Sequence, residues 1–282
     1  MNEMRGDVQD AKNAVKHLGF EQRREKIERW LSPPDPSTNY NRALQQRQKG
    51  TGLWFLQSDA FAKWKTQRNS LWLYGIPGCG KTILSSTIIE DLKRTFPRQS
   101  LLYFYFDFND TGKQTLESMV RSLISQLYCE YEDTWKQLDP LFTSCKNGHE
   151  RPACELLCKV LLQMIEQVKE VWIVLDALDE CTTRKGAPTE GLLSWIRDLV
   201  NSEQRNVHLL VTSRPEHDIK SRVSEFADKD GMIPIQSDLI TDDIHAYVRT
   251  RVRHGEGLKR WRSQPEVQDE IESRLMEQAD GM

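Results

Sequence analysis

One stretch constrains the fold of this chain more than any other: between Leu71 and Leu92, an apolar run leads through a glycine-rich turn into an amphipathic helix. The turn fits the pattern G-x-x-x-x-G-K-[ST]. In such a turn backbone N–H groups point inward to a phosphate chain, and the helix start adds its positive dipole end. The lysine reaches the β- and γ-phosphates and the threonine hydroxyl ligates Mg²⁺. The pattern predicts a phosphate-binding loop made of Gly75, Ile76, Pro77, Gly78, Cys79, Gly80, Lys81, Thr82 and Ile83. A glycine turn without a ligand is the alternative.

The rest of the chain alternates apolar runs with helical patterns. Strands are predicted at 71–74, 101–106, 171–175 and 207–211, with a short fifth at 232–235. Helices are predicted at 1–31, 40–49, 61–64, 81–92, 116–127, 156–165, 192–200 and 267–278, with one more capped by Thr241 or Asp242 and a looser region over 131–151. This alternation predicts an α/β fold, a parallel sheet covered by helices on both faces. Ligands of such sheets bind at the carboxyl ends of the strands.

Two more motifs fall at such strand ends. Asp176 follows a buried strand, where its carboxylate can share Mg²⁺ with Thr82; a helix or turn cap is the alternative. Asp179 or Glu180 could orient a water for attack on a γ-phosphate, or either could take part in a surface salt bridge. Arg214 could stabilise the charge of the γ-phosphate, or pair with a neighbouring carboxylate.

A glycine pair lies upstream of the loop. Gly50, Thr51 and Gly52 form a turn before the apolar run 53–56, and Ser58 or Asp59 can cap the helix that follows. The simpler interpretation is an entry helix that packs on the sheet. The alternative is that the turn lines the base pocket of a nucleotide.

Composition excludes several classes of protein. The chain has 282 residues, 38% of them hydrophobic and 29% charged, and a net charge of −3, which does not favour nucleic acid or an anionic membrane. It shows neither a secretory signal nor an apolar run long enough for a membrane span. Six scattered cysteines favour a reducing, cytoplasmic setting. The spacing of Cys145, His149, Cys154 and Cys158 would suit zinc, with packed thiols as the alternative.

Taken together, these motifs resemble the NACHT class of P-loop NTPases, in particular the fungal NLR-like (STAND) signalling proteins. The resemblance is carried by GTGLW (50–54), GIPGCGKT (75–82), LDALDEC (175–181) and TSRPE (212–216). It implies a five-stranded sheet in the order 5-1-4-3-2 and a sensor role for Arg214. It also implies a signalling switch of fungal innate immunity, inactive with ADP, active and homo-oligomeric with ATP, and slow at hydrolysis.

The resemblance also suggests a division of the chain. Residues 1–44 would be an N-terminal helical segment with a Pro-rich linker, 45–236 the NACHT domain and 237–282 a partial helical domain that stops before the winged helix and the repeat or effector domains of the family. The chain lacks the [NT]KxD motif of guanine specificity, which favours ATP or ADP over GTP. Two other functions stay open: a P-loop kinase or mechanical ATPase, with Arg249, Arg251 and Arg253 as lid candidates, and a scaffold with a structural nucleotide.

Overall fold

The computed structural model describes residues 21–67, 70–97, 99–131, 134–186, 191–201 and 206–279. Within these residues, the strands form one five-stranded sheet in the order β2-β3-β4-β1-β5. All neighbouring strands are parallel. The strands are β1 Ser70–Tyr74, β2 Ser100–Tyr105, β3 Val171–Asp176, β4 Val207–Ser213 and β5 Met232–Pro234. The predicted strands and the predicted strand order are therefore confirmed.

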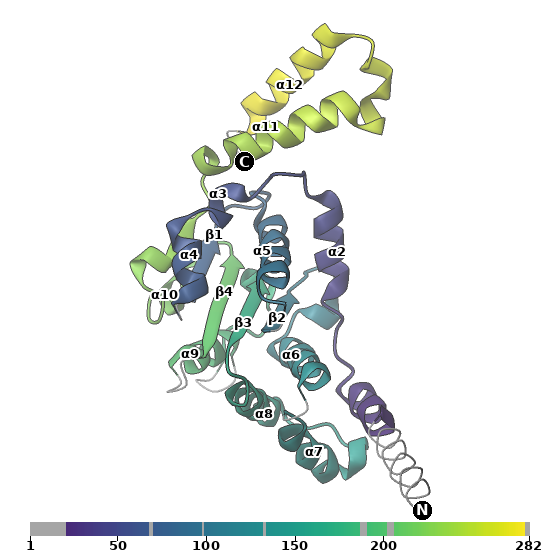
Figure 1. Ribbon diagram of the computed structural model, residues 1–282, viewed down its shortest axis with the longest axis vertical. Helices are drawn as coiled ribbons and strands as arrows, with labels where there is room; N and C mark the ends of the chain where they lie inside the picture. Colours follow the sequence, from purple (N-terminus) through teal and green to yellow (C-terminus); the bar gives the residue numbers. More distant parts are fainter. Residues whose placement is uncertain are drawn as a thin grey trace, which may run out of the picture.

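Helices cover both faces of the sheet (Figure 1). Their bounds are α2 Ser37–Gln46, α3 Leu53–Leu56, α4 Asp59–Thr66, α5 Lys81–Thr95, α6 Leu116–Glu130, α7 Trp135–Ser144, α8 Cys154–Glu166, α9 Leu192–Asn201, α10 His217–Val223, α11 Ser237–His254 and α12 Pro265–Ala279. Residues 21–31 are also helical, whereas the part of the predicted first helix over 1–20 lies outside the described residues.

The apolar strands supply two cores because successive side chains point to opposite faces. In β3, Ile173 and Leu175 join the core that α6, α8 and α9 cover. Trp172 and Val174, between them, join the core under α4 and α5. This two-sided burial explains why the strands read as continuous apolar runs.

Several helices differ from the sequence-based expectation. The stretch predicted to be loose contains α7, whose interior Pro140 removes a helix hydrogen bond, but Leu138 and Phe142 are buried one turn apart and hold the helix together. The short α10 was not predicted. The predicted caps Thr241 and Asp242 are wrong, because α11 begins at Ser237, where its buried Ile240 joins the core of α5.

The bounds of α2, Ser37–Gln46, also differ from the predicted range of 40–49. The helix starts at Ser37, three residues before the predicted start, because an Asp35 carboxylate oxygen accepts the Ser37 N–H at 2.8 Å. The predicted Ser58 cap is present, since its hydroxyl accepts the N–H of Phe61 at 3.2 Å. At the far end of the chain, α11 and α12 pack on each other as a hairpin that projects from the body beside α3 (Figure 1).

Candidate nucleotide-binding site

The sheet order brings the loops of the predicted site together. β4 lies between β1 and β3, and all three run in the same direction. The glycine loop after β1, the aspartate that ends β3 and the arginine after β4 therefore lie at one edge of the sheet. Within the described residues, no helix is both long enough and apolar enough to span a bilayer.

The glycine loop runs from Gly75 to Gly80 and leads directly into α5. Gly78 and Gly80 have φ values of +83° and +87°, a region that side chains disfavour, and Gly80 is the N-cap of the helix. Gly75 serves a different purpose, because a Cβ there would lie 2.7 Å from the Cys79 sulfur. The loop thus has the backbone shape that the motif predicts.

Lys81, the first residue of α5, folds back over this loop. Its ammonium donates to the carbonyl oxygens of Gly75 and Ile76, each at 2.8 Å, and lies 3.7 Å from the Cys79 sulfur. The two carbonyl partners are neutral, and among the residues that the structure describes no carboxylate forms an ion pair with this ammonium. The charge therefore stays available to an anion that enters the loop.

Asp176 is buried at the tip of β3 and is held by hydroxyl groups. Its Oδ2 accepts from Thr82 at 2.7 Å, while its Oδ1 accepts from Ser85 at 2.6 Å and from Thr212 at 2.7 Å. Burial raises the pKa of this carboxyl, and the three hydroxyls and the charge of Lys81 act in the opposite direction. The predicted proximity of Thr82 and Asp176 is present in the structure.

This arrangement fits a magnesium ion. Asp176 forms no ion pair with a cation of the described residues, although its carboxylate is buried beside the loop. A carboxylate and a hydroxyl are hard oxygen ligands of the kind that Mg²⁺ takes together with substrate phosphates. By contrast, no three histidine, cysteine or acidic side chains of the described residues gather as they would around zinc.

Sequence reasoning missed two residues of this site, Ser85 and Thr212. Ser85 lies three residues after Thr82 on α5, and helical spacing places both hydroxyls on the side that faces Asp176. Thr212 also accepts the N–H of Ala177 at 3.0 Å, so it orients both the carboxylate and the chain that follows it. Helical spacing could have revealed Ser85, whereas Thr212 depends on the alignment of β3 and β4.

Asp179 and Arg214 bind each other. The Arg214 Nε lies 3.1 Å from Asp179 Oδ2, and the Arg214 backbone N–H donates to Oδ1 at 3.0 Å. The Asp179 side chain is only 4% exposed, so this carboxylate is enclosed and faces the arginine. Arg184 contacts the Asp179 carbonyl oxygen and also pairs with Glu216 and Asp218. The ion pair that the sequence allowed for Arg214 is therefore formed, and Arg184 braces it.

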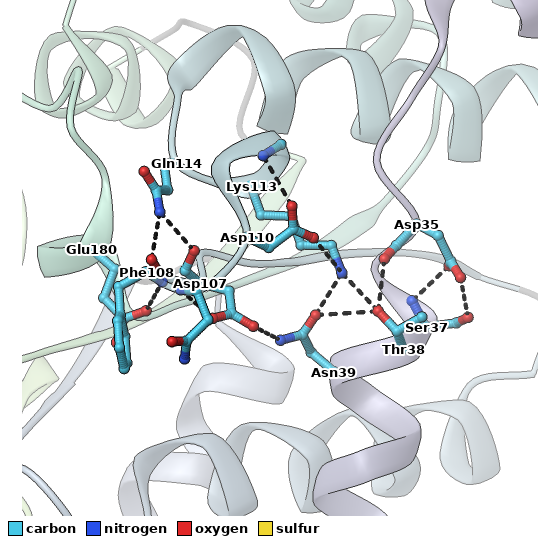
Figure 2. Close-up of polar contacts among 12 residues, drawn as sticks. Asp35, Ser37, Thr38, Asn39, Asp107, Phe108, Asp110, Lys113, Gln114 and Glu180 are labelled. Carbon is cyan, nitrogen blue, oxygen red and sulfur yellow. Dashed lines mark hydrogen bonds and ion pairs between the residues drawn. The ribbon is translucent and has the colours of Figure 1, made fainter.

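Glu180 is the freer of the two acidic residues. It is half-buried, and one of its carboxylate oxygens accepts the backbone N–H of Phe108 at 2.9 Å (Figure 2). Burial raises the pKa of Glu180; the Phe108 N–H acts against this shift, and the nearby carboxylates of Asp179, Asp176 and Asp107 add to it. A carboxyl whose pKa is raised in this way is a stronger base once ionised, which suits a residue that accepts a proton from water.

The turn at Gly50, Thr51 and Gly52 lies over α5. A Cβ on Gly52 would come within 3.2 Å of Leu84, and its backbone N–H donates to Asp243 of α11 at 2.7 Å. Burial raises the pKa of the Asp243 carboxyl, and the Gly52 N–H opposes that shift. The turn thus joins the helix of the phosphate loop to the α11–α12 hairpin.

A parallel sheet of this order, with a glycine loop after β1 and a buried aspartate at the tip of β3, is the architecture of P-loop NTPases. A sequence model of the family described as Nephrocystin 3, N-terminal, matches residues 50–214. This is more than half of the chain, and the chain belongs to that family.

A curated relative agrees with this assignment. Over 214 residues the chain is 23% identical to the vegetative incompatibility protein HET-E-1 of Podospora anserina. The matched region covers 72% of this chain and 15% of that protein, so the chain spans only a small part of the relative's length. Together the two matches confirm the resemblance to fungal NACHT-type proteins.

Proposed function

We propose that this chain binds ATP or ADP with Mg²⁺ at the glycine loop, hydrolyses ATP slowly and acts as a nucleotide-dependent switch in signalling. The observation that carries the proposal is the 2.7 Å contact between Thr82 and Asp176 beside the loop. Ser85 and Thr212 already donate to the buried carboxylate. The Thr82 hydroxyl, at the start of the helix that follows the loop, adds to them the one hydroxyl that the motif assigns to the magnesium of a bound nucleotide.

Each residue has a defined part in this function. The amides of residues 75–83 bind the phosphate chain, and Lys81 leaves the carbonyl oxygens of Gly75 and Ile76 to reach the β- and γ-phosphates. Thr82 and Asp176 hold Mg²⁺, which supplies charge neutralisation at the phosphates when bound. Glu180 would orient the attacking water, and Asp179 holds Arg214, whose guanidinium would stabilise charge on the γ-phosphate. The turn at 50–52 borders the base.

We assign the chain segments accordingly, with 1–44 as an N-terminal helical segment, 45–236 as the NACHT domain and 237–282 as part of a helical domain. We further propose a cytoplasmic protein that forms homo-oligomers when ATP is bound. The absence of the [NT]KxD motif supports adenine over guanine. The alternative of a P-loop kinase would need arginines such as Arg253 in a lid over the nucleotide. The guanidinium of Arg253 instead contacts Gln268, Asp269 and Glu272 of α12, so it does not support that alternative.

Mass analysis of nucleotide released from the denatured, purified protein tests this function, followed by single-turnover hydrolysis of added ATP. We expect adenine nucleotide, and turnover well below the roughly 1–100 s⁻¹ of kinases. A guanine nucleotide would overturn the base assignment. Rapid turnover that depends on an added acceptor would overturn the switch in favour of a kinase.

A further inference from the structure

A polar network joins α2 to Glu180, the acidic residue that follows β3 at the candidate site (Figure 2). It involves the loop between β2 and α6, which we call the 107–114 loop. On one side this loop contacts Glu180, and on the other it contacts the start of α2. The family match begins only at residue 50, so α2 lies outside the region that the family defines.

The 107–114 loop is tied to the acidic segment at two points. The Phe108 N–H donates to Glu180 at 2.9 Å, and the Gln114 carbonyl oxygen accepts the N–H of Thr182 at 2.8 Å and its hydroxyl at 2.9 Å. The Gln114 side chain closes the loop on itself, since its amide donates to the carbonyl oxygens of Asp107 and Phe108 at 3.2 and 2.7 Å. The place of the Phe108 N–H therefore depends on the whole loop.

From the other side, Asn39 of α2 fixes the same loop with both ends of its amide. Its nitrogen donates to Asp107 Oδ2 at 2.8 Å, and its oxygen accepts the Lys113 ammonium at 2.6 Å. The Lys113 side chain is only 6% exposed, and its ammonium also donates to the Thr38 hydroxyl at 2.7 Å. Two charged groups of the loop, one at each end, thus meet at one amide.

This geometry has a use beyond holding the fold together. A buried ammonium is costly unless its N–H groups are hydrogen-bonded. Because Lys113 donates to Thr38 and Asn39, moving the loop away from α2 would break these bonds at a large cost. Asp107 directly precedes Phe108, and its Oδ1 accepts the N–H of Asn109 at 2.9 Å, so the carboxylate that Asn39 holds is bonded to the backbone on the far side of Phe108 and restrains the Phe108 N–H between these two points. Asn39 can therefore influence Glu180 without touching it, through its hydrogen bond to Asp107 and the hydrogen bond from the neighbouring Phe108 N–H to Glu180.

We propose that Asn39, together with Lys113, is a positioning residue for Glu180, so that this one side chain of α2 contributes to the hydrolytic site. The inference rests on the proposed function, in which Glu180 orients water. If the inference holds, a change in the segment before residue 37 that moves α2 would alter the rate of hydrolysis through Asn39.

The test compares Asn39→Ala with Ser37→Ala. Ser37 is the matched control because it lies on the same helix end, and its hydroxyl contacts only Asp35 in this network. We expect Asn39→Ala to lower kcat for ATP by about 10- to 100-fold, since a misplacement of 1 Å can cost about 100-fold, with nucleotide Kd unchanged. The acid limb of its pH–rate profile should move to higher pH, because Glu180 loses the N–H that lowers its pKa. Ser37→Ala should match the wild type.

Two additions keep this inference testable on its own. Amide hydrogen exchange at Phe108 should become faster in Asn39→Ala and stay unchanged in Ser37→Ala, whether or not the protein hydrolyses ATP. Should Asn39→Ala fail to fold, Asn39→Asp keeps the acceptor for Lys113 and sets a carboxylate against Asp107, with the same expected effects. Equal exchange and equal kcat in the Asn39 and Ser37 variants would overturn the inference. Wild-type protein without ATP hydrolysis would instead overturn the proposed function.

Discussion

Replacing Asp176 by asparagine separates the metal role of this side chain from its place in the fold. The variant keeps Oδ1, which accepts from Ser85 and Thr212, and its new amide nitrogen can donate to Thr82, whose hydroxyl then accepts. The buried hydroxyls of Ser85 and Thr212 therefore keep their acceptor, and the exposed Thr82 hydroxyl can turn its hydrogen to solvent. The penalty of about 1–3 kcal/mol for an unsatisfied group is limited to the second N–H of the new amide.

Removing the negative charge of Asp176 should also favour the folded state of the variant at neutral pH. Burial raises the pKa of Asp176 in the folded protein above its ordinary value of about 3.9. The stability linked to its protonated form is present below that ordinary value and is lost as the pH rises through the raised pKa. At neutral pH the buried charge therefore opposes folding. Nucleotide-free Asp176→Asn should unfold at the same temperature as the wild type or a higher one.

Nucleotide binding should respond in the opposite way. Loss of a group that holds or orients a metal typically lowers metal affinity by about 10- to 100-fold, equivalent to about 1.4–2.7 kcal/mol. We expect the factor by which Mg²⁺ tightens ATP binding to fall by that amount. The assay is a titration of a fluorescent ATP analogue with and without Mg²⁺, together with thermal unfolding.

Asp91→Asn is the matched control for this prediction. Asp91 is another buried aspartate, on α5, and its carboxylate lies 3.6 Å from Lys65 and 2.8 Å from Arg94. This control should lose stability and keep the magnesium effect. An unchanged magnesium effect in folded Asp176→Asn would refute the metal role of Asp176.

Two further predictions concern the neighbours of this carboxylate. Glu180→Gln should keep ATP affinity and lower turnover by about 10²–10⁴-fold. Because burial raises the pKa of Glu180, the turnover of the wild type should begin to decrease, as the pH is lowered, at a pH above the ordinary carboxyl value of about 4.3. The reasoning fails if the pH–rate profile is flat down to pH 4. Thr212→Val removes the hydroxyl that donates to Asp176 and accepts from Ala177, so chemical denaturation should report a loss of about 1–3 kcal/mol. Wild-type stability in this variant would show that the buried hydroxyl carries no such weight.

The sequence predicted the sheet well because its strands are buried on both faces. A run such as Val171–Asp176 is apolar at nearly every position, and a fixed motif marks the loop after β1. The order of the strands came from the family resemblance, since apolar runs alone do not say which strands pair.

What the sequence did not reveal depends on contacts between distant segments. α7 carries an interior proline and holds together through its buried side chains, and α11 starts early because Ile240 reaches the core of α5. The pairing of Arg214 with Asp179 and the contact of Asn39 with Asp107 join residues 35 and 68 positions apart. No local pattern encodes such partners, because they arise only once the strands are aligned.

Calorimetric titration of the wild type and Lys81→Ala with ATP, in Mg²⁺ and in a chelator, tests the account most directly. The loop, the lysine and the buried carboxylate predict a single ATP site that Mg²⁺ strengthens and that Lys81→Ala loses while the protein stays folded. Equal ATP affinity in the two proteins, or no binding by the wild type with Mg²⁺ present, would contradict the account.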